Sequence, residues 1–284
     1  MATLKQIRQR IRTAKNIRQI TRAMKLVAAA RLTRAKNRVE QARPYSDKMR
    51  EFIGSIGAGG DMPPNPLLAR RPVKKTVLVV MSAERGLCGS FNSALIRKAG
   101  DFLKEAEGEV SLIGVGKKAA AFYSKRGYGE VFRVTPPTAG PELSNAVELT
   151  DKVRQMFVSG EVDAVHVLYS KFYSPIRQEP TIVQVLPIEP PTDAEPTNKT
   201  YEFEPDPEEL LDLLLPKYLL TVIFQAMLES SASEHGARMT AMTSATDNAG
   251  KMIDQLTLTA NRVRQASITK EILEIVAGAE ALKS

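Results

Sequence analysis

Cysteine and histidine are scarce in this chain of 284 residues, and their scarcity excludes several kinds of site. Cys88 is the only cysteine, so no disulfide can form within the chain, and a thiol-reducing compartment is the expected setting. The only histidines are His166 and His235. One cysteine and two histidines are too few for a zinc cage, and we expect neither a metal nor a cofactor.

Long apolar runs are also missing. The longest, such as Val77 to Met81, are far shorter than the roughly 20 residues that cross a bilayer. The N-terminus has no apolar core of the kind that signal peptides have. It is Arg-rich and acid-poor like a transit peptide, but its heptad pattern continues past Val39 and therefore predicts mature structure.

Acidic residues are scarce at the N-terminal end, where 15 Lys or Arg within positions 1–50 face only Glu40 and Asp47. That segment carries +13, and because the whole chain carries +8, the remainder sums to −5. The asymmetry predicts an acidic partner, which could be nucleic acid, anionic lipid or an acidic protein surface. Aromatic residues that could stack on bases are absent before Tyr45, which disfavours nucleic acid.

The C-terminal segment, residues 208–284, has no proline for 68 residues after Pro216. Apolar or small residues recur there at spacings of three and four, with one shift of phase before Ile268: Ala249, Met252, Leu256, Thr259, Val263, Ala266, Ile268, Ile272, Ile275, Ala279 and Leu282. This seam predicts a coiled-coil helix on the order of 100 Å long. A single domain of this size needs no such helix for its own core, so the helix needs a partner.

Residues 3–56 predict a second long helix. Its seam runs through Leu4, Ile7, Ile11, Ala14, Ile17, Ile20, Met24, Ala28, Leu32, Ala35, Val39 and Ala42. Two steps of three at Ala14–Ile17–Ile20 predict local overwinding, and Pro44 predicts a kink or an end. We expect the two long helices to pair antiparallel. A large helical bundle is the alternative, disfavoured because the middle of the chain offers no further long helices.

The middle of the chain changes period. Short β-branched runs predict buried strands at 76–81, 109–115, 164–169 and 181–186, and helical stretches lie between them at 92–107, 117–126 and 142–159. This alternation predicts an α/β sandwich with a mostly parallel sheet. The expected division is therefore a helix at 1–60, an α/β domain at 72–207 and a helix at 208–284.

The segment Glu84–Asn92 follows the first strand and precedes a helix, where a phosphate loop would lie. Its spacing matches neither GxGxxG nor GxxxxGK[ST], so a tight turn is the favoured interpretation, and Gly114–Gly116 is interpreted likewise as a turn. Cys88 lacks an evident base, because His166 lies in an apolar strand and His235 on the long helix, remote from the sheet. The sequence predicts no catalytic site.

Three segments together resemble the γ subunit of F-type ATP synthases: Ile7–Leu32, the turn at 84–92, and Ala232–Leu282 with SEHGARMTAM, ATDNA and RQASITKEILEIV. The resemblance implies an antiparallel coiled-coil shaft inside a hexamer of α and catalytic β subunits. It also implies a Rossmann-like α/β foot against the ε subunit and the membrane c-ring. One non-catalytic copy per complex would couple proton or sodium flow to ATP synthesis or hydrolysis and regulate the ATPase. The implied location is the cytoplasmic side of a bacterial plasma membrane, peripherally bound, without nucleic acid.

The resemblance also assigns residues. Met24 and Arg238 would face the acidic lever loop of a catalytic subunit, with Lys25 supplying complementary charge. Positions matching the upper shaft, in contact with catalytic-subunit loops, are Arg264, Gln265, Thr269 and Glu271. Tyr201 and Glu204 match the foot near the c-ring and ε. Two other readings stay open from the residues themselves: a basic coiled-coil adaptor for nucleic acid, and an α/β enzyme with a helical stalk.

Overall fold

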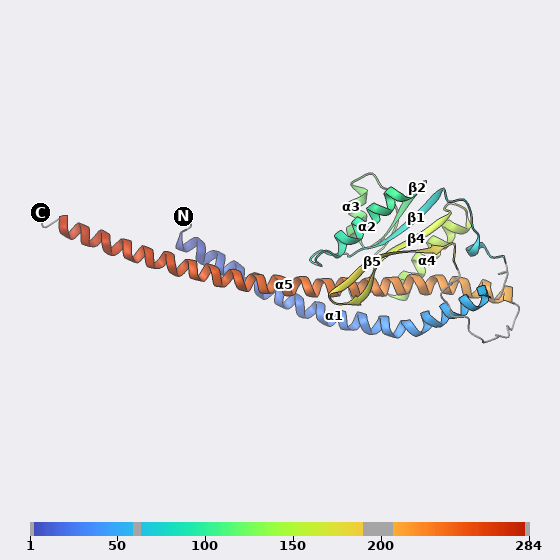
Figure 1. Cartoon of the computed structure of the whole chain (residues 1–284), viewed down its shortest axis with the longest axis horizontal. Helices are drawn as coiled ribbons and strands as arrows, with labels where there is room; N and C mark the ends of the chain where they lie inside the picture. The colour runs from blue at the N-terminus through green and yellow to red at the C-terminus, as the bar shows by residue number, and fades with distance from the viewer. Residues whose placement is uncertain (1–2, 59–63, 190–206, 282–284) are drawn as a thin grey trace. The chain divides into compact units, whose positions relative to one another are not determined.

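The computed structural model describes residues 3–58, 64–189 and 207–281. They form two compact units, one from residues 1–27 and 239–284 (unit 1) and one from residues 28–238 (unit 2), each taken within the described ranges. Two long helices, α1 (Leu4–Ala58) and α5 (Pro207–Ala281), contribute to both units (Figure 1). Both helices were predicted from the sequence; the three-segment domain division stays a prediction.

Unit 1 consists of the start of α1 and the second half of α5, side by side and antiparallel (Figure 1). The Thr246 hydroxyl donates to the Thr21 hydroxyl oxygen at 2.8 Å. Four residues later on α5, Gly250 faces Arg18, which comes three residues earlier on α1. Because numbers rise on one helix as they fall on the other, the predicted antiparallel pairing is confirmed in this unit.

The buried seam on α5 shares every second residue with the predicted seam. Between those shared residues, the buried position lies one residue later than predicted. Ala249, Ile253 and Ala260 are buried, and Leu256 and Val263 are half-buried, which keeps a steady alternation of four and three. Seven predicted seam members are exposed instead. Four lie after the expected shift of phase, at Ile268, Ile272, Ile275 and Ala279, where no buried seam continues. The other three lie before it, at Met252, Thr259 and Ala266. The error arose because neighbouring positions are both apolar or small, so the period fits two registers and only the partner helix selects one.

The seam on α1 is also more regular than predicted. Ile17 is 48% exposed and Ile20 is 59% exposed, while the polar residue Thr21 is buried. The seam therefore passes from Ala14 to Thr21 through Arg18, and the expected overwinding is wrong. The apolar pattern alone suggests overwinding, because the seam positions after Ala14 are occupied by the polar residues Arg18 and Thr21.

In unit 2 the same α1 seam continues through the buried residues Ala28, Leu32, Ala35, Val39, Met49 and Ile53. Pro44 lies inside α1, so it does not end the helix as the sequence allowed. Pro44 has no amide hydrogen, so the carbonyl one turn earlier in the helix loses its hydrogen-bond donor. Because Pro44 is exposed, water can supply a donor in its place.

Unit 2 contains a five-stranded sheet in the order β3-β2-β1-β4-β5. The strands are β1 (Lys75–Met81), β2 (Glu109–Val115), β3 (Glu130–Val134), β4 (Ala164–Ser174) and β5 (Arg177–Leu186). The first four are parallel to their neighbours and β5 is antiparallel to β4. The mostly parallel sheet was predicted, but β3 was missed because charged Glu130 and Arg133 interrupt its short apolar pattern.

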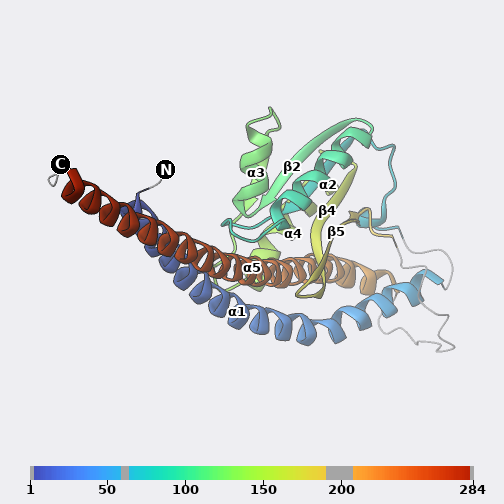
Figure 2. The same ribbon diagram turned by 60° about the vertical axis from the view of Figure 1, so that its left-hand side comes forward.

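Helices cover both faces of the sheet (Figure 2). On one face, α2 (Phe91–Glu105) and α3 (Lys117–Ser124) close a core that includes Leu78 and Leu95. On the other, α4 (Leu143–Val158) and the first part of α5 close the larger core around Phe157 and Leu215. A short 3-10 helix, η1 (Pro66–Leu68), precedes β1.

By length and composition alone, α5 is apolar enough to cross a membrane: it has an 18-residue window of mean hydropathy 1.5, a third of which is buried. The sequence-based exclusion drawn from short apolar runs was therefore too strict. The core helix of a soluble protein passes the same test. In unit 2, α5 has one face in the core, where it buries Leu211, Leu215, Leu219 and Ile223 against the sheet.

Candidate functional surfaces

The turn between β1 and α2 is tight and internally bonded. The Asn92 side-chain oxygen accepts from the Ala83 amide at 3.0 Å, and the Asn92 side-chain amide donates to the Cys88 sulfur at 3.1 Å. Leu87 adopts the left-handed conformation (φ 63°) and is 64% exposed, and Gly89 is also left-handed (φ 57°). A left-handed leucine is costly, so the surrounding contacts must fix the turn and present this apolar side chain outward.

Arg238 of α5 supplies those contacts. One of its guanidinium nitrogens lies 2.6 Å from the Glu234 carboxylate. The other terminal nitrogen reaches the carbonyl oxygens of Arg85 and Gly86 at 3.5 and 3.4 Å, at the long end of hydrogen bonding. The Arg238 side chain is only 12% exposed. Its charge is therefore already engaged within unit 2, between the helix and the turn.

Burial dominates the titration of the groups beside this contact. It raises the pKa of Glu234 despite the nearby guanidinium, and it raises the pKa of the Cys88 thiol. Burial lowers the pKa of His235 to about 4, helped by the positive charges of Arg238 and Arg31. A neutral, buried histidine and a protonated, buried thiol form no activated nucleophile.

The expectation that His235 lies remote from the sheet is wrong. The neighbouring Ser230 and Ser233 donate hydrogen bonds to the carbonyl oxygens of Met81 on β1 and Ser170 on β4. His235 is buried on the same stretch of helix. Because α5 packs along the sheet here, residues far apart in the sequence meet, which no local pattern indicated.

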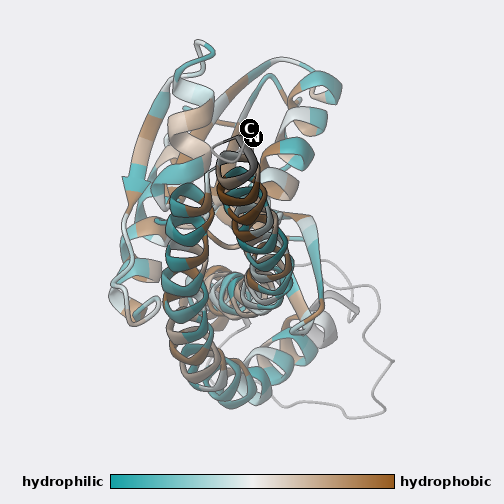
Figure 3. Ribbon diagram, turned by 90° about the vertical axis from the view of Figure 1, so that its left-hand side faces the viewer, coloured by the Kyte–Doolittle hydropathy of each residue, from teal (hydrophilic) through white to brown (hydrophobic). Residues whose placement is uncertain are grey.

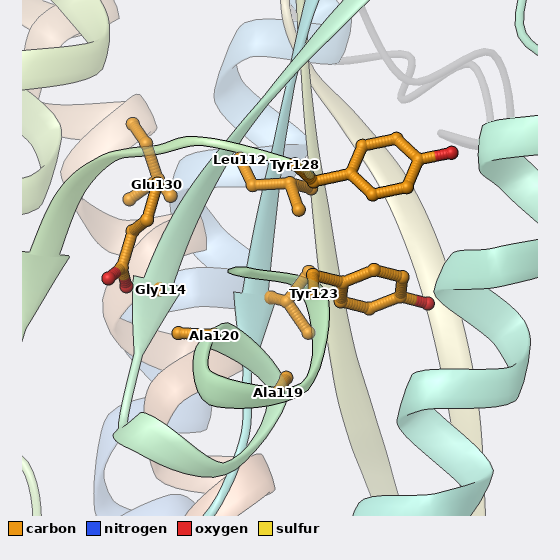
Figure 4. A pocket seen from close by; sticks show the side chains of 9 residues that line it. Leu112, Gly114, Ala119, Ala120, Tyr123, Tyr128 and Glu130 are labelled. Atoms are coloured by element: carbon orange, nitrogen blue, oxygen red, sulfur yellow. The ribbon is translucent and has the colours of Figure 1, made fainter. Parts of the chain in front are cut away.

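A second buried feature is a small cavity between β2 and α3 (Figure 4). Its space of about 10 Å³ is room for about one water molecule. Glu130 reaches over Gly114, and a Cβ there would come within 2.2 Å of a Glu130 oxygen. Gly114 thus lies within β2 rather than in the predicted turn, and only Gly116 forms the turn into α3. Among the described residues, no three His, Cys, Asp or Glu side chains gather where they could hold a metal ion.

Six of the predicted contact residues lie in unit 1. Met24 and Lys25 are half-buried, followed by exposed Leu26 and Val27. Arg264, Gln265, Thr269 and Glu271 are all exposed on α5. Met24 belongs to unit 1 and Arg238 to unit 2. Tyr201 and Glu204 lie outside the described residues.

The end of α5 carries an exposed apolar surface, which we call the tip surface. It consists of Ile268 (49% exposed), Ile272 (55%), Leu273 (62%), Ile275 (71%) and Val276 (54%). Figure 3 shows the apolar colouring at this end of α5, in contrast to the largely hydrophilic α1. So many large apolar side chains on one exposed helix end indicate a surface that another protein covers.

The comparisons with known proteins agree over the whole chain. A family model described as ATP synthase matches residues 3–282. The chain is 45% identical to the ATP synthase gamma chain of Moorella thermoacetica over 283 residues, covering 100% of both chains. It is 44% identical to that of Brevibacillus brevis over 281 residues, covering 98% of each. In fold it resembles a chain in the mitochondrial ATP synthase structure of Euglena gracilis, with 18% identity, a TM-score of 0.72, and coverage of 98% of this chain and 94% of the other.

Proposed function

This chain belongs to the family of ATP synthase gamma chains, and we propose that it is the rotor of the central stalk, coupling ion flow across the membrane to ATP synthesis and hydrolysis. The full-length match to bacterial gamma chains is the observation that carries the proposal. The geometry supports it, because two antiparallel helices with an exposed apolar end suit a shaft that other subunits enclose.

We assign unit 1 to the interior of a hexamer of α and β subunits. The tip surface would be covered by apolar loops of that hexamer, with the exposed Arg264, Gln265, Thr269 and Glu271 supplying polar contacts. Met24 and Lys25 would meet the acidic lever loop of a β subunit, because the half-buried Met24 is followed by exposed apolar residues on a strongly basic helix. Arg238 stays a predicted contact of the same loop, although its charge is already paired with Glu234 within unit 2.

Unit 2 is assigned to the foot, against the ε subunit and the membrane c-ring. Its α/β sandwich offers a rigid body through which torque could pass to the helices, because α1 and α5 both enter its core. Tyr201 and Glu204 stay predicted contacts of this foot. We place the complex on the cytoplasmic side of a bacterial plasma membrane, with one peripheral copy of this chain.

The mechanism is one of differential contact. A rotor can shift a catalytic subunit between two conformations only if its contacts favour one of them. Moving a two-state equilibrium from 1:99 to 99:1 takes about 5.5 kcal/mol, which several contacts of about 1 kcal/mol each can supply. The helix pair is asymmetric, because the side chains on its surface differ from one side of the pair to another. Rotation then gives each of the identical β subunits a different face, and the rotor itself performs no catalysis.

Reconstitution tests the proposal. Purified α and β subunits of a related bacterial enzyme would be combined with and without this chain, and ATP hydrolysis and complex mass measured. We expect a complex containing one copy of this chain and hydrolysis that depends on it. A chain cut back after Val263 serves as a matched control, because it keeps the described helix pairing but lacks the tip surface. If the full chain neither assembles nor changes hydrolysis, the proposal fails.

A further inference from the structure

A groove runs along the edge of the sheet in unit 2, separate from the turn at 84–92 and from the tip surface. Its volume is about 780 Å³. It lies between α1, represented by Arg43 and Asp47, the strand β5, and the face of α5 that carries Tyr218, Gln225 and Glu229. All of these residues belong to one unit.

The strand β5 presents its backbone to this groove. Thr181 and Val183 pair with Tyr169 and Val167, and their side chains therefore share the α5 face of the sheet. Ile182 packs on the opposite face, against the core beneath α2, yet it also lines the groove. Residues from both faces of β5 therefore line the groove. This is possible only if the groove runs along the edge of the strand.

Among the residues that the structure describes, nothing pairs with that edge. The sheet ends at β5, and within the described ranges no backbone hydrogen bond reaches residues 181–185 from anything other than β4. Pro180 in the same strand has no amide hydrogen, as is usual for an edge strand. Open edges of this kind accept a further strand through backbone hydrogen bonds.

The floor of the groove contains buried acceptors without donors. Glu229 is only 7% exposed, and one of its carboxylate oxygens has no hydrogen-bond partner within the described chain. The other oxygen accepts from the Gln225 amide at 3.1 Å, and the Gln225 carbonyl oxygen likewise has no partner. A buried carboxylate with a free oxygen is costly unless a donor reaches it, and an ammonium or guanidinium group is the strongest donor available.

We propose that this groove binds an extended segment of a partner protein, which adds to β5 as a sixth strand and places one lysine or arginine side chain on Glu229. The backbone edge requires an extended occupant, and the two unmet acceptors require a basic side chain on its inward face. A helix could satisfy neither the row of edge groups nor the buried carboxylate at once. The basic residues Arg43, Arg50 and Lys171 also line the groove and favour acidic or neutral residues elsewhere in the segment.

The inference does not depend on the rotor role and is tested on the isolated full-length chain. The probe is a capped synthetic peptide, Thr-Val-Lys-Val-Thr-Val, titrated while amide hydrogen exchange is followed by mass spectrometry. We expect saturable slowing of exchange in residues 181–185. Replacing the probe's lysine by glutamate should weaken binding about tenfold or more, because a hydrogen bond to a buried charged group is lost.

Glu229→Gln in the protein is the complementary change and keeps the side-chain volume. It should weaken the lysine probe by about the same factor while Glu161→Gln, at an exposed turn, leaves binding unchanged. If Glu229→Gln does not fold, the comparison of lysine and glutamate probes on the parent chain decides alone. Equal exchange with and without the lysine probe, or equal binding of both probes, would overturn the proposal.

Discussion

Arg238 follows Glu234 by one helical turn on α5, and its guanidinium lies 2.6 Å from the Glu234 carboxylate while also reaching the carbonyl oxygens of Arg85 and Gly86. One side chain thus pairs with a half-buried acid and holds a strained turn. Leu87, the left-handed residue in that turn, stays exposed because the turn is fixed from beneath. This contact links the long helix to the α/β domain chemically as well as by packing.

Removing the guanidinium should destabilise unit 2 and loosen the turn. We expect Arg238→Met to cost about 2 kcal/mol, because it leaves the half-buried Glu234 carboxylate without its partner. Cys88, the lone thiol, gives a direct measure, since it is buried in this turn. Its alkylation by N-ethylmaleimide should accelerate at least tenfold in the variant.

The control for that experiment is Arg154→Met. Arg154 pairs with Asp151 on α4, but both side chains are largely exposed. The loss should be at most about 1 kcal/mol, with no change in the alkylation of Cys88. Equal effects of the two substitutions would contradict the assigned role of Arg238.

The buried imidazole of His235 predicts a loss of stability in acid. Its pKa is about 4 in the folded chain, below the ordinary value of 6.5. Between these pH values the unfolded chain binds the proton and the folded chain does not, so stability falls as pH drops from 7 to 4. The contribution is up to about 3 kcal/mol.

Urea unfolding of the parent chain and of His235→Gln, measured at intervals from pH 7 to 4, checks this prediction. Other groups titrate in the same range, so the informative quantity is the difference between the two chains. That difference should shift in favour of the variant as pH falls. Parallel stability curves would show that His235 does not titrate as its burial requires.

The corrected seam predicts unequal effects at adjacent positions on α5. Ile253 is buried in unit 1, whereas Met252 is 54% exposed. Ile253→Ala should lower the local stability of the helix pair by about 2 kcal/mol, and Met252→Ala by less than about 0.5 kcal/mol. Hydrogen exchange of the α5 amides reports this local opening separately from unit 2. A larger loss of stability for Met252→Ala than for Ile253→Ala would instead support the seam predicted from the sequence.

The tip surface should matter only in the assembled complex. Ile272→Asp places a charge where we propose that apolar loops enclose the helix, so assembly with α and β subunits should weaken at least tenfold. The melting temperature of the isolated chain should hardly change, because Ile272 is 55% exposed there. Ile272→Leu keeps the surface apolar and should assemble normally. Normal assembly of the aspartate variant would remove this surface from the account.

The sequence predicted much of the fold because its signals are local. The long proline-poor stretches gave both helices, and the β-branched runs gave four of the five strands in β1, β2, β4 and β5. The register of the helix pair was less accessible. Ile253 and Met252 fit the same period equally well, and Thr21 fills a seam position that apolar counting ignores.

The candidate sites depended on tertiary contacts and were harder to foresee. The spacing of Glu234 and Arg238 at i and i+4 could have indicated an ion pair. Nothing local indicated that the same arginine reaches the turn at 84–92, or that Glu229 lies beneath an open sheet edge. Such positions follow from how α5 lies along the sheet, which the sequence pattern does not contain.

Observation of rotation tests the central claim most directly. The chain would be assembled with immobilised α and β subunits, with a probe attached at an introduced cysteine replacing exposed Lys125 in a Cys88→Ser background. On addition of ATP, the account predicts continuous rotation of the probe in one direction, coupled to hydrolysis. A complex that hydrolyses ATP at the full rate while the probe stays fixed would contradict it.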